Sequence, residues 1–259
     1  MQAAQPQPEQ WSFAIDGDLH YDVLADPSKA FTTRKPSSVL KLKAAKPHFV
    51  IVPGDMIEHG ADGSKPWYKG CSRAKVADEL SVFQSDYMGQ VEAAGIKCYC
   101  CLGNHDYSRN YPDMNVLSFI RDHYGATYNK GDPDSSGCYS FDYCGVRFAV
   151  LGVFPKDIVW TKALLARTSA TMPLIFVWHY NTDPSQPWSD WWSQAQRATF
   201  FDLIQDRVDA GKVLCIFNGH MHGSTSSIFR GVNVVVASGN DKLCIVRMSG
   251  TNVQSITHL

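Results

Sequence analysis

Short apolar runs alternate along the chain with longer stretches that have the spacing of helices. The apolar runs have the length of buried strands, and each stops just before a group of polar residues. They cover residues 11–15, 49–52, 96–102, 174–178 and 213–217. The helical stretches cover residues 37–46, 76–94, 116–123, 157–166 and 194–208. Pro47 would end the first helix, and Gly95 would cap the second.

Two later segments have the pattern of antiparallel strands. Residues 139–151 predict a hairpin with its turn near Cys144-Gly145, and residues 228–246 predict a pair of strands. Alternating strands and helices, with hairpins added late, are typical of a layered α/β sandwich. Open sheets place their sites at the ends of strands, which is where the polar groups of this chain stand.

The distribution of these polar groups favours one domain. They are spread over almost the whole length of 259 residues, so a division of the chain would divide them. The composition, 44% hydrophobic and 19% charged, is that of a globular protein with a sizeable core. We therefore expect a single domain over residues 11–259, preceded by a disordered tail over residues 1–10.

The amino-terminal residues and the net charge limit the compartment and the partners. Residues 1–8 lack the positive and apolar regions of a signal peptide. This predicts a cytoplasmic protein, or a secreted one if the start is a processed or engineered terminus. A net charge of −1 offers no basic footprint, so nucleic acid is disfavoured as a partner. No apolar run approaches the roughly 20 residues of a membrane-spanning helix. The oligomeric state stays open, and a monomer fits the sequence.

The chain has eight cysteines, an even number, but it is too large to need a disulfide framework. Five of them lie in apolar runs and are expected to be buried free thiols. These five are Cys98, Cys100, Cys101, Cys215 and Cys244. Cys71, Cys138 and Cys144 stand in turn-rich or hairpin-like segments and are the better candidates for a bridge.

Five short polar motifs follow one another in a fixed order. They are Asp18-x-His20, Gly54-Asp55, Gly103-Asn104-His105-Asp106, the single His179 and Gly219-His220-x-His222. Each alone is weak evidence, because such pairs and single histidines occur by chance in many chains. Together they supply carboxylate, amide and imidazole donors, the mixture that can hold two divalent ions close together without quenching their Lewis acidity.

In this order the motifs resemble those of the calcineurin-like metallophosphoesterases, and the resemblance spans residues 18–222. The resemblance implies a four-layer α/β/β/α sandwich of two mixed β-sheets flanked by helices. It also implies a dinuclear metal-dependent hydrolase whose substrate is a small phosphate ester, either a phosphomonoester or a small-molecule phosphodiester. Its cofactors would be two divalent or trivalent ions, chosen among Mn, Fe, Zn, Ni and Co.

The same resemblance assigns roles to the motif residues. One ion would be held by Asp18, His20, Asp55 and His222, and the other by Asp55, Asn104, His179 and His220. A hydroxide that bridges the two ions would attack phosphorus. His105 would act as general acid toward the departing oxygen, and Asp106 would hold its imidazole in the required orientation. Asp16, although close to Asp18, is expected to have a structural or supporting role.

Residues beside the motifs are candidates for substrate contacts. His59 lies on the loop after Asp55, and loops beside a site often carry function. Tyr107, Tyr180 and Asn181 each flank a motif residue and could line the mouth of the site, although ordinary packing explains them equally well. The aromatic stretch at residues 187–192 could form a lid, but packing under a long loop is the favoured interpretation.

Departures from subfamily patterns narrow the prediction. Glu58 stands where purple acid phosphatases have a tyrosine ligand, so an iron-tyrosinate centre is not expected. His59 and Asp106 replace the Arg and Glu of protein Ser/Thr phosphatases, which disfavours that branch. Two alternatives remain open: a metal-dependent nuclease of the same superfamily, against which the charge argues, and a non-catalytic protein-binding scaffold, which would be expected to lack ligands.

Overall fold

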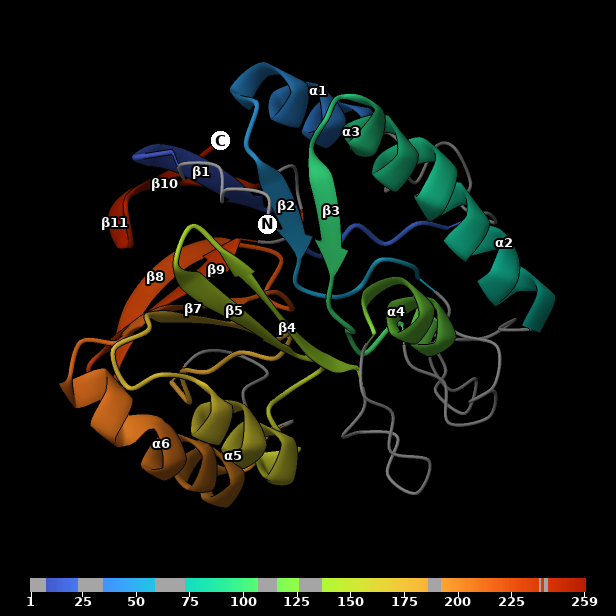
Figure 1. The fold of residues 1–259 in the computed structure, drawn as a ribbon. Coiled ribbons are helices and arrows are strands. Elements are labelled where there is room, and N and C mark those ends of the chain that lie inside the picture. The colour runs from blue at the N-terminus through green and yellow to red at the C-terminus, as the bar shows by residue number, and fades with distance from the viewer. Residues whose placement is uncertain are drawn as a thin grey trace, which may run out of the picture.

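Two β-sheets lie face to face at the centre of the molecule (Figure 1). The structure is a computed structural model that describes residues 8–22, 35–58, 73–106, 116–125, 137–185, 192–237, 239 and 242–259. The first sheet has the strand order β11-β10-β1-β2-β3. Its strands are β1 (Gln10–Ile15), β2 (Phe49–Val52), β3 (Lys97–Cys100), β10 (Cys244–Ser249) and β11 (Asn252–His258). Strands β1, β2 and β3 are parallel, whereas β10 is antiparallel to both of its neighbours.

The second sheet has the order β4-β5-β6-β7-β9-β8. Its strands are β4 (Cys138–Tyr143), β5 (Val146–Leu151), β6 (Leu174–Val177), β7 (Val213–Asn218), β8 (Ser224–Phe229) and β9 (Val232–Ala237). Its four central strands are parallel, and the antiparallel strands β4 and β8 form its edges. Both sheets are therefore mixed.

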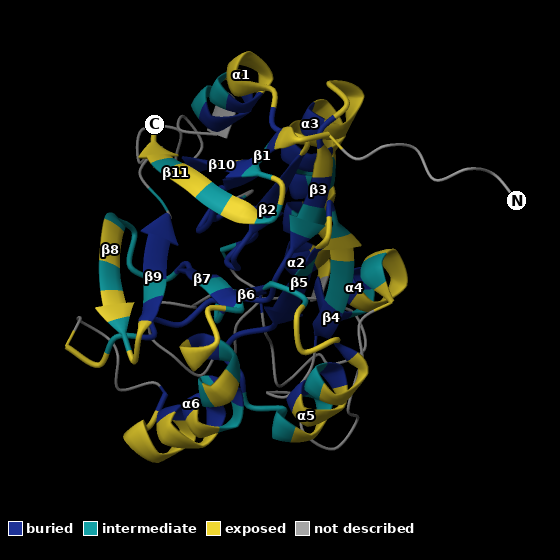
Figure 2. Ribbon diagram, turned by 60° about the vertical axis from the view of Figure 1, so that its left-hand side comes forward, coloured by how far each residue is buried: buried dark blue, intermediate teal, exposed yellow. Residues whose placement is uncertain are grey.

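Aromatic side chains from both sheets fill the space between them. The ring of Phe13 on β1 lies 5.2 Å from that of Phe148 on β5 and 5.7 Å from that of Phe217 on β7. The ring of Phe49 on β2 lies 5.6 Å from that of Phe141 on β4. Full burial of such a side chain contributes about 1.5–3 kcal/mol. Figure 2 shows the inner strands in the colour of buried residues and exposed residues on the outer helices. The core thus lies between the sheets.

Helices cover the outer face of each sheet (Figure 1). Three lie on the first sheet: α1 (Lys35–Ala45), α2 (Arg73–Phe83) and α3 (Gly89–Ala93). Two lie on the second: α5 (Ile158–Arg167) and α6 (Gln194–Asp209). A further helix, α4 (Val116–Tyr124), follows β3 in the chain. The arrangement is the expected four-layer sandwich of two mixed sheets flanked by helices. None of the helices in the described ranges is long and apolar enough to cross a membrane.

Most predicted elements are present, but two differ from the prediction. The helix expected over 76–94 is interrupted by a π-helical turn, η2 (Gln84–Met88). The pairing expected within 228–246 is present in part: the end of β8 pairs with β9, Ile228 with Asn233 and Phe229 with Val232, whereas β10 belongs to the other sheet and pairs with β1 and β11. The place of β10 was not predicted because strand pairing depends on long-range contacts that local pattern does not contain. Strand β1 also begins at Gln10, inside the segment expected to be a tail; residues 1–7 lie outside the described residues.

The hairpin predicted over 139–151 is present, and the thiols predicted to be buried and free are so. Strands β4 and β5 are joined at Cys144-Gly145, where both residues have positive φ, 46° and 76°. Turns of this kind match the twist of a hairpin.

The seven cysteines that the structure describes are all buried and free, including Cys138 and Cys144, which were the better candidates for a bridge. Cys71 lies outside the described residues.

Trp192, from the aromatic stretch at 187–192, is fully buried, and its ring lies 5.6 Å from that of Trp178. Packing, the favoured interpretation, is confirmed for this residue. The other two tryptophans of the stretch lie outside the described residues.

Candidate metal centre

The five motifs stand on loops that leave the carboxyl ends of parallel strands. The loops after β1, β2 and β3 carry Asp18 and His20, Asp55, and Asn104 respectively, and the loops after β6 and β7 carry His179, and His220 and His222. Because the carboxyl ends of parallel strands meet at one edge of a sheet, the loops of each sheet converge there. Hydrogen bonds join the loops of the first sheet, from Asp18 N to Gly54 O and from His20 N to Asp55 O.

The backbone of these loops is left-handed at most of the predicted ligands. Five of the seven have positive φ, between 45° and 70°. They are Asp18, His20, Asp55, His220 and His222. This conformation is uncommon for residues other than glycine and costs about 1–3 kcal/mol at each position, so it persists only where the surrounding structure imposes it. Residues two apart can face the same site because the chain curls in this way.

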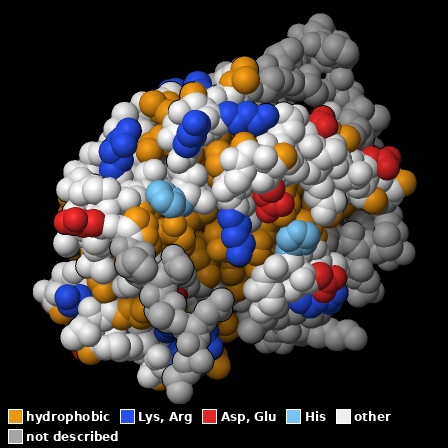
Figure 3. Space-filling view, turned by 45° about the horizontal axis from the view of Figure 1, so that its top comes forward, with side chains coloured by type: hydrophobic (Ala, Val, Ile, Leu, Met, Phe, Trp, Pro, Cys, Tyr) orange, Lys and Arg blue, Asp and Glu red, His pale blue; other side chains and the backbone are white. Residues whose placement is uncertain are grey.

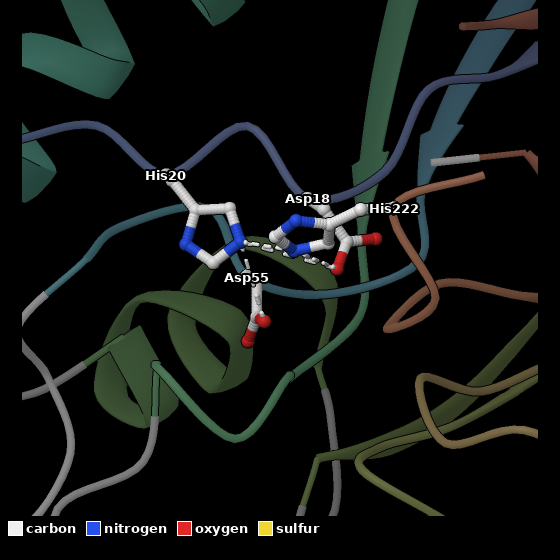
Figure 4. A group of neighbouring side chains, drawn as sticks. All are labelled: Asp18, His20, Asp55 and His222. Atoms are coloured by element: carbon white, nitrogen blue, oxygen red, sulfur yellow. Dashed lines mark hydrogen bonds and ion pairs between the residues drawn. The ribbon is translucent and has the colours of Figure 1, made fainter. Parts of the chain in front are cut away.

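The first cluster contains Asp18, His20, Asp55 and His222 (Figure 4). The Nε2 atoms of His20 and His222 are 2.9 Å apart. His222 Nε2 is 3.4 Å from Asp18 Oδ1, and His20 Nε2 is 3.6 Å from Asp55 Oδ2. The carboxylates are almost completely buried. These four residues are the set that the resemblance assigned to one ion.

The second cluster contains Asp55, His179 and His220. His179 Nε2 lies 3.3 Å from Asp55 Oδ2 and 2.8 Å from Asn104 Oδ1. The rings of His179 and His220 have centroids 5.0 Å apart. The same oxygen of Asp55 therefore faces a histidine of each cluster, which is the position that a bridging carboxylate requires.

Acceptor atoms close to the far nitrogens orient two of the imidazoles. His20 Nδ1 lies 2.7 Å from Glu58 Oε2, and His179 Nδ1 lies 2.9 Å from Pro53 O. Both partners are acceptors, and they turn the Nε2 atom of each ring toward the cluster. Imidazole nitrogens and carboxylate oxygens that converge in this way fit a bound cation, and an outer acceptor on the second nitrogen is typical of metal-binding histidines.

The electrostatics of the buried groups agree with a cation site. Burial alone would raise the pKa of Asp55, but His179 and His105 hold it well below its ordinary value. Burial alone would likewise lower the pKa of His179, yet the attraction of Asp55 raises it to about 9. Burial and repulsion from His179 lower the pKa of His220 to about 4. Buried carboxylates that stay ionised need positive charge beside them.

Three glycines allow the loops to approach one another. A Cβ on Gly54 would lie 2.6 Å from His179 Nδ1, and one on Gly219 would lie 2.6 Å from Pro53 O and 2.7 Å from Asp18 Oδ2. A Cβ on Gly103 would collide with the backbone and carboxylate of Asp55. The glycines of the motifs are therefore required by contact between loops.

The comparisons with known proteins agree with this geometry. The model of the calcineurin-like phosphoesterases matches residues 12–224. The chain belongs to this family. None of the curated proteins compared with it is similar in sequence.

Solved structures share the fold of this phosphoesterase. A dimetal phosphatase from Danio rerio is similar with a TM-score of 0.65 at 12% identity, over 96% of this chain and 98% of that one. A putative 5'-nucleotidase from Staphylococcus aureus is similar with a TM-score of 0.56 at 12% identity, over 96% of this chain and 54% of that one. A Thermus thermophilus protein, TT1561, has a TM-score of 0.53 at 10% identity, with 96% and 98% covered. The family and the Asp/His clusters together indicate divalent metal ions as cofactors.

His105 lies beside the first cluster of this phosphoesterase. Its side chain is 20% exposed, and its ring centroid is 4.6 Å from that of His20. Its backbone N–H donates to Asp55 Oδ1 at 2.8 Å. Its Nδ1 lies 2.8 Å from Glu58 O and 3.6 Å from Glu58 Oε1. Glu58 thus contacts both His105 and His20, a role that the motifs did not predict, although Glu58 stands at the position of the tyrosine ligand of purple acid phosphatases.

The carboxylate of Asp106 does not hold His105 as expected. It is fully buried and accepts hydrogen bonds from Gly103 N at 2.8 Å and Ile57 N at 3.1 Å. Burial, reinforced by repulsion from Asp55, raises its pKa to about 8. Asp106 therefore ties the loop after β3 to the loop after β2, and the atoms that orient His105 belong to Glu58. The expectation failed because adjacency in sequence does not make two side chains adjacent in a tight turn.

The four candidate substrate contacts divide into two pairs. His59 and Tyr107 lie outside the described residues. Tyr180 is 8% exposed, and its ring centroid is 4.9 Å from that of His220. Asn181 is 1% exposed, and its Oδ1 accepts a hydrogen bond from Asp183 N at 3.3 Å. Asp16 has the structural role expected of it, because it accepts hydrogen bonds from Tyr87 and Ser38.

Proposed function

We propose that this chain is a hydrolase of small phosphate esters that works with two metal ions. The observation that carries the proposal is the position of Asp55 Oδ2, which lies within 3.6 Å of His20 Nε2 and 3.3 Å of His179 Nε2. A single carboxylate oxygen between imidazole nitrogens of both clusters suits two neighbouring cations. Phosphomonoesters and small-molecule phosphodiesters are both within the proposal.

The residues that would hold the ions are those of the two clusters. Asp18, His20, Asp55 and His222 would bind one ion, and Asp55, Asn104, His179 and His220 would bind the other. Bound ions of this kind act as Lewis acids toward a phosphoryl oxygen and activate water at neutral pH. Mn, Fe, Zn, Ni and Co all suit such mixed nitrogen and oxygen sites, so the metal is left to experiment.

His105 would donate the proton that the leaving oxygen needs. It is the partly exposed imidazole beside the first cluster, and its Nδ1 is fixed by Glu58 O at 2.8 Å, which leaves Nε2 as the atom able to meet a substrate. Glu58 would thus be a positioning residue for both His105 and His20.

The remaining candidates would divide between support of the site and contact with the substrate. Tyr180 would support His220 through ring contact. Asn181 is too deeply buried for a large contact area, and we assign it to the shape of the loop after β6. His59 and Tyr107 stay predicted substrate contacts.

The test compares metal-reconstituted protein on p-nitrophenyl phosphate and on bis-p-nitrophenyl phosphate. The proposal expects turnover of at least one of them with Mn, Fe, Zn, Ni or Co, and loss of turnover after chelation. The ratio of the two rates assigns the preference for monoesters or diesters. A chain that binds metal but turns over neither ester with any of the five would be a scaffold, and the proposal would fail.

A further inference from the structure

Helices α2 and α3 are joined by η2, the π-helical turn, into one continuous helix over the first sheet. The backbone N–H of Gly89 donates to Gln84 O, five residues back, whereas an α-helix would use the fourth. The turn therefore adds one residue, which rotates the side chains that follow it by about 100°. Turns of this kind are frequent at functional sites. The side chains that η2 buries are those of Tyr87 and Met88.

Tyr87 connects this turn to the loop that carries part of the first cluster. Its hydroxyl donates a hydrogen bond to Asp16 Oδ2 at 2.7 Å, and Ser38 of α1 donates to Asp16 Oδ1 at 3.2 Å. Asp16 follows the last residue of β1 and stands two residues before Asp18. Figure 3 shows the surface on the side of these helices, below which Asp16 and Tyr87 are buried, at 2% and 0% exposed. Because the pair is shielded from bulk water, its hydrogen bond to a carboxylate is stronger than one between neutral groups.

A second contact joins the same helix to the far end of this loop. The ring of Phe83, the last residue of α2, stacks on that of Tyr87 with centroids 5.8 Å apart. The same ring meets that of Tyr21 edge-on at 5.7 Å, and Tyr21 directly follows His20 in the chain. Residues 16–21 are therefore contacted at both ends by one helical segment, at the start by Tyr87 and at the end by Phe83.

The loop needs support because its backbone is strained. Asp18 and His20 have positive φ, 56° and 47°, a conformation that persists only where the surrounding structure imposes it. The backbone N–H groups of both residues donate to the loop after β2, which carries Asp55 of the same cluster. Those bonds join two parts of the site to each other. The contacts of Tyr87 and Phe83 instead join the site to the helical layer.

We propose that Tyr87 is a positioning residue for the ion of the first cluster. By fixing Asp16, its hydroxyl holds the loop in the conformation in which Asp18 and His20 reach the same ion. The second cluster takes both of its histidines from the loops of the other sheet, so its ion depends far less on this contact. The inference rests on the metal centre of the proposed function, but not on the reaction assigned to it.

The test is a calorimetric titration of the apo protein with Mn²⁺, in which His222→Ala identifies the binding step of the first cluster. Tyr87→Phe removes the hydroxyl and keeps the ring against Phe83. It should weaken the first-cluster step by at least about fivefold, the factor that one net hydrogen bond contributes, and leave the other step nearly unchanged. In an Asp16→Ala background the same substitution should add little, because the partner of the hydroxyl is then absent.

The matched control is Tyr139→Phe, which removes another buried hydroxyl, one that donates to Cys100 O at 2.8 Å. Denaturant unfolding should show similar losses of stability in Tyr139→Phe and Tyr87→Phe, whereas only Tyr87→Phe should weaken the first-cluster step. Unchanged affinity in Tyr87→Phe, equal losses at both steps, the same loss in the control, or no binding of Mn²⁺ by the parent protein would overturn the proposal. Hydrolysis is not measured in this titration, so a protein that binds two ions without turnover would contradict the proposed function alone.

Discussion

At the scale of single residues, Glu58 contacts two histidines that reach it from different loops. Its carboxylate meets His20 Nδ1 at 2.7 Å, and its backbone carbonyl meets His105 Nδ1 at 2.8 Å. One residue can therefore fix the tautomer of a predicted ligand and the orientation of the predicted acid. Acceptors of this kind are often as important to a metal site as the ligands themselves.

Replacing Glu58 tests this arrangement. Glu58→Gln removes the charge while keeping the shape, and should weaken metal binding by about 10–100-fold. The measurement is a metal titration of the apo protein, with Glu92→Gln, an exposed glutamate of α3, as the control. Unchanged affinity in Glu58→Gln would mean that this carboxylate does not support His20.

A second substitution separates proton donation from metal binding. His105→Ala should lower kcat by about 10²–10⁴-fold while metal content stays the same, because the proposed role of this residue is on the leaving group only. His48→Ala, which removes an exposed imidazole at the start of β2, should leave both unchanged. Loss of metal together with activity in His105→Ala would show that the residue had been misassigned.

The sequence predicted those parts of the site that depend only on the types and the order of the motif residues. Asp18, His20, Asp55 and His222 lie together as expected, since their residue types and order carry the information. The role of Asp106 could not be predicted, because it depends on which way a side chain points within a turn. The left-handed backbone at five predicted ligands could not be predicted either, because the residue types Asp and His do not by themselves indicate a positive φ.

At the scale of elements, the loop after β7 depends on a close approach to the loops after β1 and β2. A Cβ on Gly219 would meet Pro53 O at 2.6 Å and Asp18 Oδ2 at 2.7 Å, whereas one on Gly223 would meet nothing nearer than Met221 O at 3.5 Å. These two glycines belong to one short segment, so they form a matched pair.

Gly219→Ala should therefore displace the loop, with a loss of about 1–3 kcal/mol in the free energy of unfolding and weaker metal binding. Gly223→Ala should resemble the parent protein in both. Denaturant unfolding and metal titration of the two variants give the comparison. Equal behaviour would show that the loops do not need this contact.

The helix-to-sheet packing of α6 depends on Trp192. The side chain is fully buried, and its ring lies 6.2 Å from that of Phe154 and 6.3 Å from that of Phe200. Trp192→Ala should lower the free energy of unfolding by about 3–5 kcal/mol, because it leaves a large cavity. Val159→Ala, at a position 80% exposed on α5, should change it by less than about 0.5 kcal/mol. A small effect of Trp192→Ala on the free energy of unfolding would contradict the packing role and favour the alternative interpretation, in which this tryptophan belongs to a lid.

At the scale of the whole molecule, the fold brings the ends of two sheets to one place. The strands and helices could be predicted from the local pattern of apolar and polar residues, and so could the turn at Cys144-Gly145. The assignment of β9 and β10 to different sheets was not, because each strand is recruited by partners distant in sequence, β7 for one and β1 for the other. The packing of one sheet on the other then brings the loop of His220 and His222 to Asp18, whose carboxylate accepts a hydrogen bond from His220 N at 2.9 Å.

The most direct test of the account is a titration of apo protein with Mn²⁺ while hydrolysis of bis-p-nitrophenyl phosphate and p-nitrophenyl phosphate is followed. The account predicts no turnover without metal and a rate that rises until about two equivalents are bound, as a pair of ions sharing Asp55 requires. Asp55→Asn should abolish this response. Full activity at one equivalent would contradict the shared site, and absence of turnover with Mn²⁺ and with each of the other four metals would contradict the hydrolase itself.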